Sequence, residues 1–416
     1  MSVPGYDRSA LVPAVVHIGV GGFHRAHQEV YLDDLARSGK TGWGLVGVGL
    51  HRPQMGEVLG AQDGLHLVAE RSAEALAAAG DVGAMTRYVF APADREALLR
   101  VLAEPRTRVV TLTITGSAYR IDPHTGELDA DDEVVAADLD DPSHPETVFG
   151  YLVEALDRRR RSGAGPFTVL SCDDMQSNGR AARTAVTSFA RLRDPDMAEW
   201  IAQRVSFPSS MVDRITPSTT AQTREAVVEV QLVPDVSPCE TMKTRLLNAS
   251  HCALGHLGHL GHLGRLAGLR TMDEVMAEPV FRAHLQRMMA EEIAPHLPDV
   301  PGIDLGEYQA TLVERLADPR RGDQLARLYR RGSSKIPHHG VHGVPGEGPI
   351  TERLGALAAA GSGDAAPLLA ERRAFGDLGR DPRSTTAVQE ALDLLGRSGP
   401  RAAIEHHLTH DGEEAA

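Results

Sequence analysis

Short apolar runs alternate with amphipathic stretches at the start of the chain. The run over residues 11–20 is rich in β-branched side chains and ends in glycines, which is typical of a buried parallel strand. In the stretch over 21–39 that follows, apolar residues recur at helical spacing, and Gly39 is a suitable stop. A second apolar run covers 44–50. This strand–turn–helix–strand order predicts the opening of a doubly wound sheet.

The same alternation continues to about residue 192, and then the pattern changes. We predict further strands at 88–90, 109–114 and 167–172, and helices at 94–102, 147–160 and 181–192. Beyond residue 235 strand signals are nearly absent, and helices are predicted at 240–263, 280–294, 305–316, 324–329 and 384–396. The glycine- and histidine-rich stretch 338–348 is predicted to be a loop. The fold class is therefore α/β, with a Rossmann-type dinucleotide-binding domain over 1–235 and a mostly α-helical substrate-binding domain over 236–416.

Composition excludes several classes of partner. Among 416 residues, acidic side chains outnumber basic ones, and the net charge of −14 argues against nucleic acid and against an anionic membrane surface. The three cysteines have no paired spacing, so no disulfide framework is expected. Neither a secretory signal nor an apolar run long enough for a membrane helix stands out, and we expect a cytoplasmic protein. Whether it is a monomer or a dimer stays open.

The first candidate site is the glycine turn after the first strand. Gly19 and Gly21 supply the G-x-G of a dinucleotide turn, where glycine allows a tight turn and a close approach to a pyrophosphate. The helix that follows adds N–H donors and a positive dipole end. His24 stands where the third glycine is usual, so an ordinary glycine-rich loop is the alternative. The candidate cofactor-binding residues of this turn are Gly19, Gly21, Gly22, Phe23, His24 and Arg25.

The end of the second predicted strand bears on which cofactor is bound. An acidic residue often stands there and binds the adenosine ribose. Here the strand ends at Gly49 and Leu50, and His51 and Arg52 follow. These two side chains suit a 2′-phosphate and favour NADP, although Arg52 in a solvated loop explains the same pattern.

The second candidate site is the helix predicted from residue 240. Lys243, Asn248 and His251 lie among apolar residues and fall within about 140° of arc at about 100° per residue. A lysine can take a hydroxyl proton, an amide can donate to the developing alkoxide, and an imidazole can orient the substrate. Such a set can perform alcohol oxidation without a metal ion. The alternative is an amphipathic helix whose charged residues are solvated.

Three histidines after this helix do not predict a metal site. His256, His259 and His262 recur every third residue, and that spacing drifts around a helix instead of forming one face. No metal is expected, and the interleaved glycines indicate close helix packing.

Six ordered motifs give the chain a family resemblance. They are VHIGVGGFHRAHQ, TLTIT with a nearby tyrosine, PFTVLSCDDMQSNG, FPSSMVDRITPST, MKTRLLNASHCALGHLG and GSSKIP. Together they resemble the mannitol dehydrogenase family of polyol-specific long-chain dehydrogenases, from about residue 12 to 340. The resemblance implies metal-free hydride transfer between a nicotinamide cofactor and a polyol, with NAD slightly favoured. It implies Lys243 as the general base, Asn248 as the oxyanion donor and His251 as a substrate contact.

The resemblance also implies substrate-binding residues, and it shows departures from the family pattern. Asp213, Arg327 and Lys335 match positions expected to contact the hydroxylated substrate. Asp174 stands where the family has an asparagine that polarises the carbonyl, and Gly116 replaces a glutamate. A carboxylate there repels a developing alkoxide when it is ionised. The stretch between residues 213 and 243 is also short.

These departures leave the exact activity open. The prediction is an NAD(P)-dependent oxidoreductase acting on a secondary alcohol or ketone of a polyol or sugar-like compound, with mannitol/fructose chemistry as the default. Uronate/aldonate chemistry is an alternative, because Arg327 and Lys335 can pair a carboxylate. A dinucleotide-binding member without turnover, acting as a sensor or interaction protein, is the other.

Overall fold

The computed structural model describes residues 4–71, 76–121, 127–211, 215–217, 231–255, 269–319, 323–325, 369 and 380–410. The chain divides into two compact units, Met1–Val236 and Ser237–Ala416, and each is described by itself. None of the described helices combines the length and apolar character needed to cross a membrane.

The first unit is built on a five-stranded parallel sheet. Its strands are β1 (Pro13–Ile18), β2 (Gly44–Gly49), β5 (Met85–Phe90), β6 (Val109–Leu112) and β7 (Thr168–Ser171). Their spatial order is β5-β2-β1-β6-β7, and every pairing is parallel. From β1 the chain first builds the sheet outward through β2 and β5, and it then returns to add β6 and β7 on the other side of β1. The crevice at this switch point, between β1 and β6, is where open α/β sheets bind ligands. This order confirms the predicted Rossmann-type sheet.

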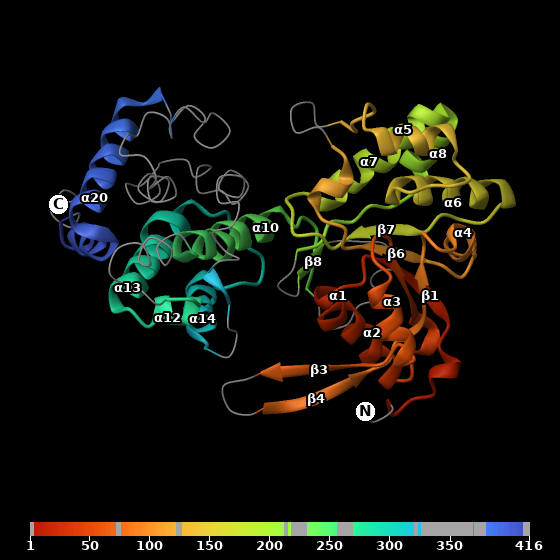
Figure 1. Cartoon of the computed structure of the whole chain (residues 1–416), viewed down its shortest axis with the longest axis horizontal. Helices are drawn as coiled ribbons and strands as arrows, with labels where there is room; N and C mark the ends of the chain where they lie inside the picture. Colours follow the sequence, from red (N-terminus) through yellow and green to blue (C-terminus); the bar gives the residue numbers. More distant parts are fainter. Residues whose placement is uncertain are drawn as a thin grey trace. The chain divides into compact units, whose positions relative to one another are not determined.

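Helices cover both faces of the sheet (Figure 1). One face carries α1 (Gly22–Ala26), α2 (Gln28–Arg37) and α3 (Gln54–Ala61). The other carries α4 (Arg95–Ala103), α5 (Glu133–Asp140), α6 (Val148–Ser162), α7 (Asn178–Arg193) and α8 (Pro195–Arg204). Short 3₁₀ turns are η1 (Arg8–Ala10), η2 (Thr41–Trp43) and η3 (Gly116–Tyr119).

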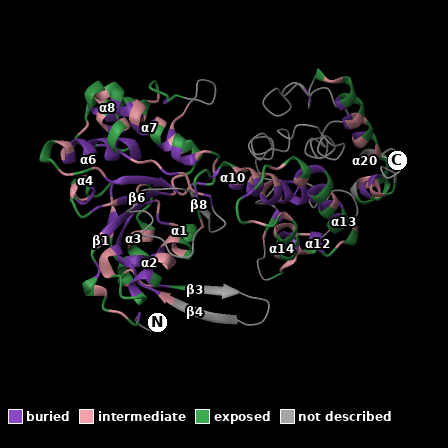
Figure 2. Ribbon diagram, turned by 180° about the vertical axis from the view of Figure 1, so that it is seen from behind, coloured by how far each residue is buried: buried purple, intermediate pink, exposed green. Residues whose placement is uncertain are grey.

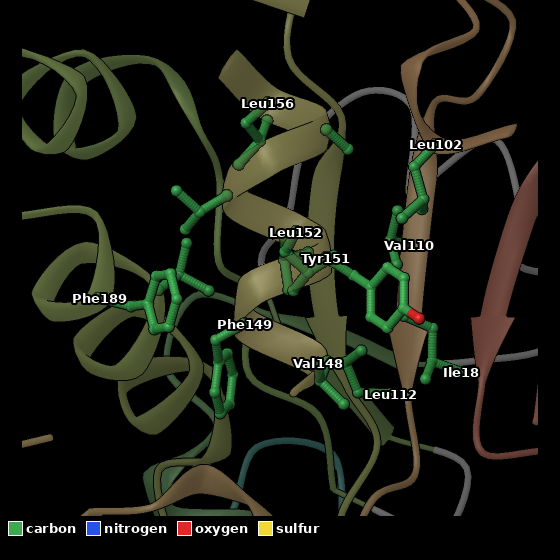
Figure 3. Close-up of a cluster of buried hydrophobic side chains, with 14 of the residues drawn as sticks. Ile18, Leu102, Val110, Leu112, Val148, Phe149, Tyr151, Leu152, Leu156 and Phe189 are labelled. Atoms are coloured by element: carbon green, nitrogen blue, oxygen red, sulfur yellow. The ribbon is translucent and has the colours of Figure 1, made fainter. Parts of the chain in front are cut away.

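Two apolar cores result from the alternation of side chains along the strands. Val16 and Ile18 of β1 point into a core with α4, α6, α7 and α8, whereas Val15 points into a second core with α2 and α3. Figure 2 shows buried residues along the sheet and along the inner faces of these helices. Figure 3 shows the larger core, in which Leu152 of α6 lies between Phe189 of α7 and Val110 of β6.

The second unit is helical in its described part. Its elements are α10 (Ser237–Lys243), the π-helical segment η4 (Thr244–Asn248), a helix over 249–255, α12 (Met272–Met276), α13 (Pro279–Arg287), the π-helical segment η5 (Met288–Ile293), η6 (Ala294–His296), α14 (Leu305–Ala317) and α20 (Pro382–His410). An isolated bridge joins Thr271 to Gln324, and α20 is kinked at Gly399, where φ is 77°.

Several sequence predictions need correction. The single helix predicted over 21–39 is wrong: the backbone breaks at His27 (φ −127°, ψ −86°), which separates α1 from α2. The antiparallel hairpin of β3 (His66–Arg71) and β4 (Leu76–Val82) was missed, because its alanine-rich second strand lacks the usual β-branched residues. The parallel pair of β8 (Ile215–Pro217) and β9 (Gln231–Val233) was also missed. The predicted loop at 338–348 lies outside the described residues.

Candidate active site

The glycine turn lies directly beyond β1 and rests against the end of β6. Gly19 has a φ of +105°, and a Cβ atom there would lie 2.1 Å from the carbonyl oxygen of Thr113. The Thr113 hydroxyl donates a 2.7 Å hydrogen bond to the Gly19 carbonyl. Only glycine satisfies both the left-handed backbone and the close approach at this position. The turn and the residues after β6 therefore form one packed unit.

The glycines that follow have a different surrounding. At Gly22, no atom of the described residues lies within 4 Å of where a Cβ would be, and at Gly21 the nearest such atom is the Gly19 carbonyl oxygen at 3.8 Å. Gly21 is the N-cap of α1, which begins at Gly22. The packing of the described protein thus gives no reason for glycine here, whereas a pyrophosphate approaching the backbone does. These residues fit a dinucleotide.

The side chains after the turn point in different directions. Phe23 is 42% exposed and packs edge-on against His27, with ring centroids 4.6 Å apart. Arg25 is half-buried and donates a 3.3 Å hydrogen bond from Nε to the carbonyl of Gly21. His24 is buried, and its ring stacks on that of His17 at 3.5 Å. His24 therefore borders the turn with its backbone while its ring lies in the interior.

Behind the turn, His24 belongs to a buried ionisable cluster that also contains Glu29 and His66. The Nδ1 atoms of His24 and His66 lie 3.8 and 3.9 Å from the two Glu29 carboxyl oxygens, which is beyond hydrogen-bond distance. Burial raises the pKa of Glu29 to about 8. It lowers the pKa of His24 far below its usual range and also lowers that of His66. All three directions favour neutral side chains, so this is a neutral cluster and not a set of salt bridges.

The far end of β2 carries the two residues that bear on cofactor choice. His51 and Arg52 are both exposed, directly before α3. At Gly49, a Cβ atom would lie 1.9 Å from the hydroxyl of Tyr88, so a larger residue there would have to displace the Tyr88 side chain. The side chains of His51 and Arg52 are therefore accessible to a ligand at the end of β2.

The ends of β6 and β7 bring the two departures from the family pattern near each other. The two strands pair in parallel, with Leu112 opposite Ser171. Gly116 follows β6 by four residues and Asp174 follows β7 by three, and both are exposed. They therefore belong to the same edge of the sheet as the glycine turn.

In the second unit, Lys243 is the last residue of α10 and is 6% exposed. The π-helical segment η4 follows it directly and ends at Asn248, which is half-buried. The Nε2 atom of His251 lies 3.8 Å from a carboxylate oxygen of Asp323. The prediction of a regular α-helix from 240 to 263 is therefore wrong at η4, and the arc worked out for regular helical spacing does not apply. Short π-helical segments of this kind are frequent at functional sites.

The remaining predicted residues lie outside the described part of the chain. These are the substrate residues Asp213, Arg327 and Lys335, and the histidines His256, His259 and His262. Within the described residues, no group of three His, Cys, Asp or Glu side chains has an arrangement that could hold a metal ion.

Several buried residues near these sites were not predicted from the sequence. Asp173 and Tyr119 are buried at the ends of β7 and η3 and share a hydrogen bond. Glu29 was overlooked because a glutamate in an amphipathic helix usually faces solvent. Glu240 lies three residues before Lys243 and is 4% exposed, and its spacing on the helix was a usable signal.

The fold and the turn define a dinucleotide-binding protein of the Rossmann class. Residues 13–234 match the mannitol dehydrogenase Rossmann domain, and residues 235–347 match the mannitol dehydrogenase C-terminal domain. The chain belongs to the mannitol dehydrogenase family, which confirms the resemblance found in its motifs.

Similar proteins cover nearly the whole chain. It is 37% identical over 487 aligned positions to a mannitol 2-dehydrogenase of Aspergillus fumigatus, covering 98% of this chain and 96% of that protein. A mannitol 2-dehydrogenase of Pyricularia oryzae is 38% identical over 480 positions, with 97% and 94% covered. Both alignments are longer than the 416 residues of this chain, so these relatives carry segments that it lacks.

Two solved structures share the fold. One is Pseudomonas fluorescens mannitol 2-dehydrogenase in a ternary complex with NAD and D-mannitol, with a TM-score of 0.84, 32% identity, and 98% of this chain and 96% of that chain covered. The other is a D-sorbitol dehydrogenase in substrate-free form, with a TM-score of 0.81, 29% identity and 96% of each chain covered.

Proposed function

We propose that this chain is an NAD-dependent polyol dehydrogenase that interconverts a secondary alcohol and a ketone without a metal ion. Membership of the mannitol dehydrogenase family supports the reaction class. The observation that carries the proposal is Lys243, a lysine that is 6% exposed and is followed by a π-helical segment ending at Asn248. A buried lysine beside a π-helical segment is unusual for a solvated amphipathic helix and suits a catalytic base.

Each proposed side chain has a separate task. Lys243 takes the proton of the substrate hydroxyl, Asn248 donates a hydrogen bond to the developing alkoxide, and His251 orients the substrate. Asp323, 3.8 Å from His251, is near enough to restrain that imidazole through a small side-chain adjustment. Asp174, which stands where the family has a carbonyl-polarising asparagine, is the fourth proposed catalytic residue, and Asp213, Arg327 and Lys335 are proposed to contact the substrate hydroxyls.

The cofactor is proposed to bind along the carboxyl edge of the sheet. When bound, its nicotinamide ring supplies the hydride acceptor or donor. The residues proposed to hold it are Gly19, Gly21, Gly22, Phe23, His24 and Arg25 in the turn, with His51 and Arg52 at the end of β2. NAD is the proposed main cofactor, as in the Pseudomonas fluorescens complex. The cationic Arg52 makes NADP a second one.

The substrate is proposed to be a linear polyol of the mannitol type. Sugar acids are the second candidate, because Arg327 and Lys335 supply two cations at positions that resemble substrate contacts. Both candidates require the same proton acceptor and the same oxyanion donor.

The test is reduced-nicotinamide absorbance with a panel of polyols, ketoses, uronates and aldonates, with each cofactor. We expect turnover on a polyol–ketose pair, and we expect Lys243→Ala to lower it by about 100- to 10,000-fold, the usual contribution of a general base. NADH binding by the same variant, followed by fluorescence, is the control for folding. No turnover on any compound, with NADH binding intact, points instead to the binding protein without catalysis. Undiminished turnover in the Lys243→Ala variant contradicts the catalytic assignment.

A further inference from the structure

Backbone strain is concentrated where β6 and β7 end. Thr115 has φ 74° and ψ 150°, a region of backbone space that is populated almost only by glycine. Arg120 and Ser177, with φ values of 52° and 53°, flank the same strand ends in the left-handed region. Thr115 is neither glycine nor asparagine, so its Cβ opposes this conformation and something nearby has to hold it.

Asp173 holds this residue through a buried carboxylate. Its Oδ1 atom accepts a 2.7 Å hydrogen bond from the backbone N–H of Thr115, and Oδ2 accepts a 2.8 Å bond from the hydroxyl of Tyr119. That hydroxyl also lies 2.6 Å from Oγ of Ser171. Asp173 is 8% exposed and Tyr119 is fully buried, so the bond between these two side chains is sheltered from water, whereas the bond to the N–H of the exposed Thr115 is partly buried. Both partners of the Asp173 carboxyl group, Thr115 and Tyr119, come from the loop and the 3₁₀ turn after β6. Ser171, which closes β7, accepts a 3.4 Å hydrogen bond from the Asp173 N–H.

Asp173 is itself fixed from the other side. Its carbonyl accepts hydrogen bonds from the Nδ2 atom of Asn178 at 3.0 Å and from the N–H of Met175 at 2.9 Å. The side-chain oxygen Oδ1 of Asn178 in turn accepts a hydrogen bond from the N–H of Ser210. Asp173 is therefore held by hydrogen bonds to both its backbone and its side chain. A residue fixed in this way can hold a strained neighbour in place, whereas a freely moving side chain cannot.

The strained residue lies next to the glycine turn. The hydroxyl of Thr113, two residues earlier, donates to the carbonyl of Gly19, and His17 lies 3.0 Å from the same hydroxyl. Thr115 and Gly116 are exposed beyond this contact. Because β1 and β6 are the two strands at the reversal of the sheet, this exposed segment forms one side of the crevice.

We propose that Asp173 is a positioning residue for dinucleotide binding: it holds Thr115 at a positive φ that glycine normally adopts, so that residues 113–116 form the wall opposite the glycine turn. The inference rests on the proposed function, since it names how that cofactor site is kept in shape. Asp173 does not touch the cofactor in this account. It acts through the backbone of Thr115.

The experiment compares the affinity of full-length variants for NADH by fluorescence titration. Asp173→Ala removes the clamp, and we expect the Kd for NADH to rise on the order of tenfold, as Thr115 relaxes to an ordinary conformation. Asp173→Ala with Thr115→Gly should recover most of that loss, because glycine adopts the same backbone conformation without the clamp. Asp173→Asn keeps an acceptor oxygen for Thr115 and should stay within about threefold of the parent protein.

The control is a buried aspartate of the same unit with a structural role. Asp138, 1% exposed, accepts hydrogen bonds from the N–H groups of Glu146 and Thr147 before α6. Asp138→Ala should lower the Tm while the Kd for NADH stays unchanged, which separates positioning from general destabilisation. Should Asp173→Ala fail to fold, the Tm of Thr115→Gly decides: release of strain predicts an equal or higher Tm, and a lower one overturns the clamp.

The two proposals fail in different ways. An unaltered Kd in Asp173→Ala, or no recovery in the double variant, overturns the positioning role while leaving the dehydrogenase proposal intact. A parent protein that binds neither NADH nor NADPH overturns the proposed function, and the positioning role with it.

Discussion

The buried carboxyl group of Glu29 predicts an unusual pH dependence of stability. Glu29 is fully buried between His24 and His66, and its pKa is raised from 4.5 to about 8, mainly by burial. The Nε2 atom of His66 lies 3.1 Å from the carbonyl of Arg25, which can only accept, so Nδ1 is the unprotonated nitrogen that faces Glu29. A protonated, neutral Glu29 carboxyl group is compatible with this unprotonated nitrogen, whereas the negative charge of an ionised carboxylate would face its lone pair. Glu29→Gln replaces the neutral acid with a neutral group of the same shape.

The sign and the size follow from proton linkage. A carboxyl whose pKa is raised by folding binds its proton more tightly in the folded state, so stability is complete below pH 4.5 and is lost as the pH rises towards 8. Between pH 5 and pH 7 the wild-type protein should lose about 2.5 kcal/mol of unfolding free energy relative to Glu29→Gln. His24 and His66, whose pKa values are lowered, act in the opposite direction below pH 6.5. They are present in both proteins and cancel in the difference.

The assay is urea unfolding at pH 5, 6, 7 and 8, followed by tryptophan fluorescence. The chain has two tryptophans, Trp43 and Trp200, and both belong to the unit that contains Glu29, so the signal reports that unit. Any constant cost of burying the glutamine amide drops out when the difference is followed over pH. A difference that does not vary with pH would refute the reasoning. So would a wild-type protein that gains on the variant as the pH rises, since that is the direction expected for a carboxyl whose pKa is lowered by folding.

Three further predictions concern the core and the site. Leu152→Ala in the larger core should cost about 2–5 kcal/mol of unfolding free energy, and a loss below 1 kcal/mol in urea unfolding contradicts the packing described. Arg52→Ala should weaken NADPH binding more than NADH binding in fluorescence titrations, and equal effects would remove Arg52 from the 2′-phosphate site. Asp174→Asn should raise kcat on mannitol or fructose by about 100- to 1,000-fold if the missing oxyanion donor limits turnover, and no gain would mean that Asp174 does not limit it.

The sheet was predictable from sequence because its signals are local. Each strand is a short apolar run, and each run ends at glycine or a polar residue, as at Gly19 and Cys172. The strand order could be expected once the alternation with helices was recognised. The hairpin β3–β4 could not be predicted in the same way, because its alanine-rich second strand carries neither helical nor strand periodicity.

The site was only partly predictable, because side-chain direction depends on distant contacts. The position of His24 in the glycine motif suggested a ligand contact, yet its ring stacks on His17 in the interior. Regular α-helical spacing predicts that Lys243 and Asn248 share one face of a helix. The π-helical segment Thr244–Asn248 changes their angular separation, so that prediction does not apply. Asp173 carries no local signal at all, since its importance comes from Thr115, 58 positions away in sequence.

The pairing of β6 with β7 relates the two departures from the family pattern, Gly116 and Asp174, to each other. A carboxylate is lost at Gly116 and another is present at Asp174, and these residues follow neighbouring strands whose ends are paired in register. The negative charge at this edge of the sheet is thus shifted by one strand rather than removed. Both residues adjoin the clamp, because Gly116 follows Thr115 and Asp174 follows Asp173. If Asp173 holds Thr115 as proposed, the same hydrogen bonds also hold Gly116 and Asp174 in place relative to the glycine turn, and Asp173→Ala should then alter the KM for substrate as well as the Kd for NADH.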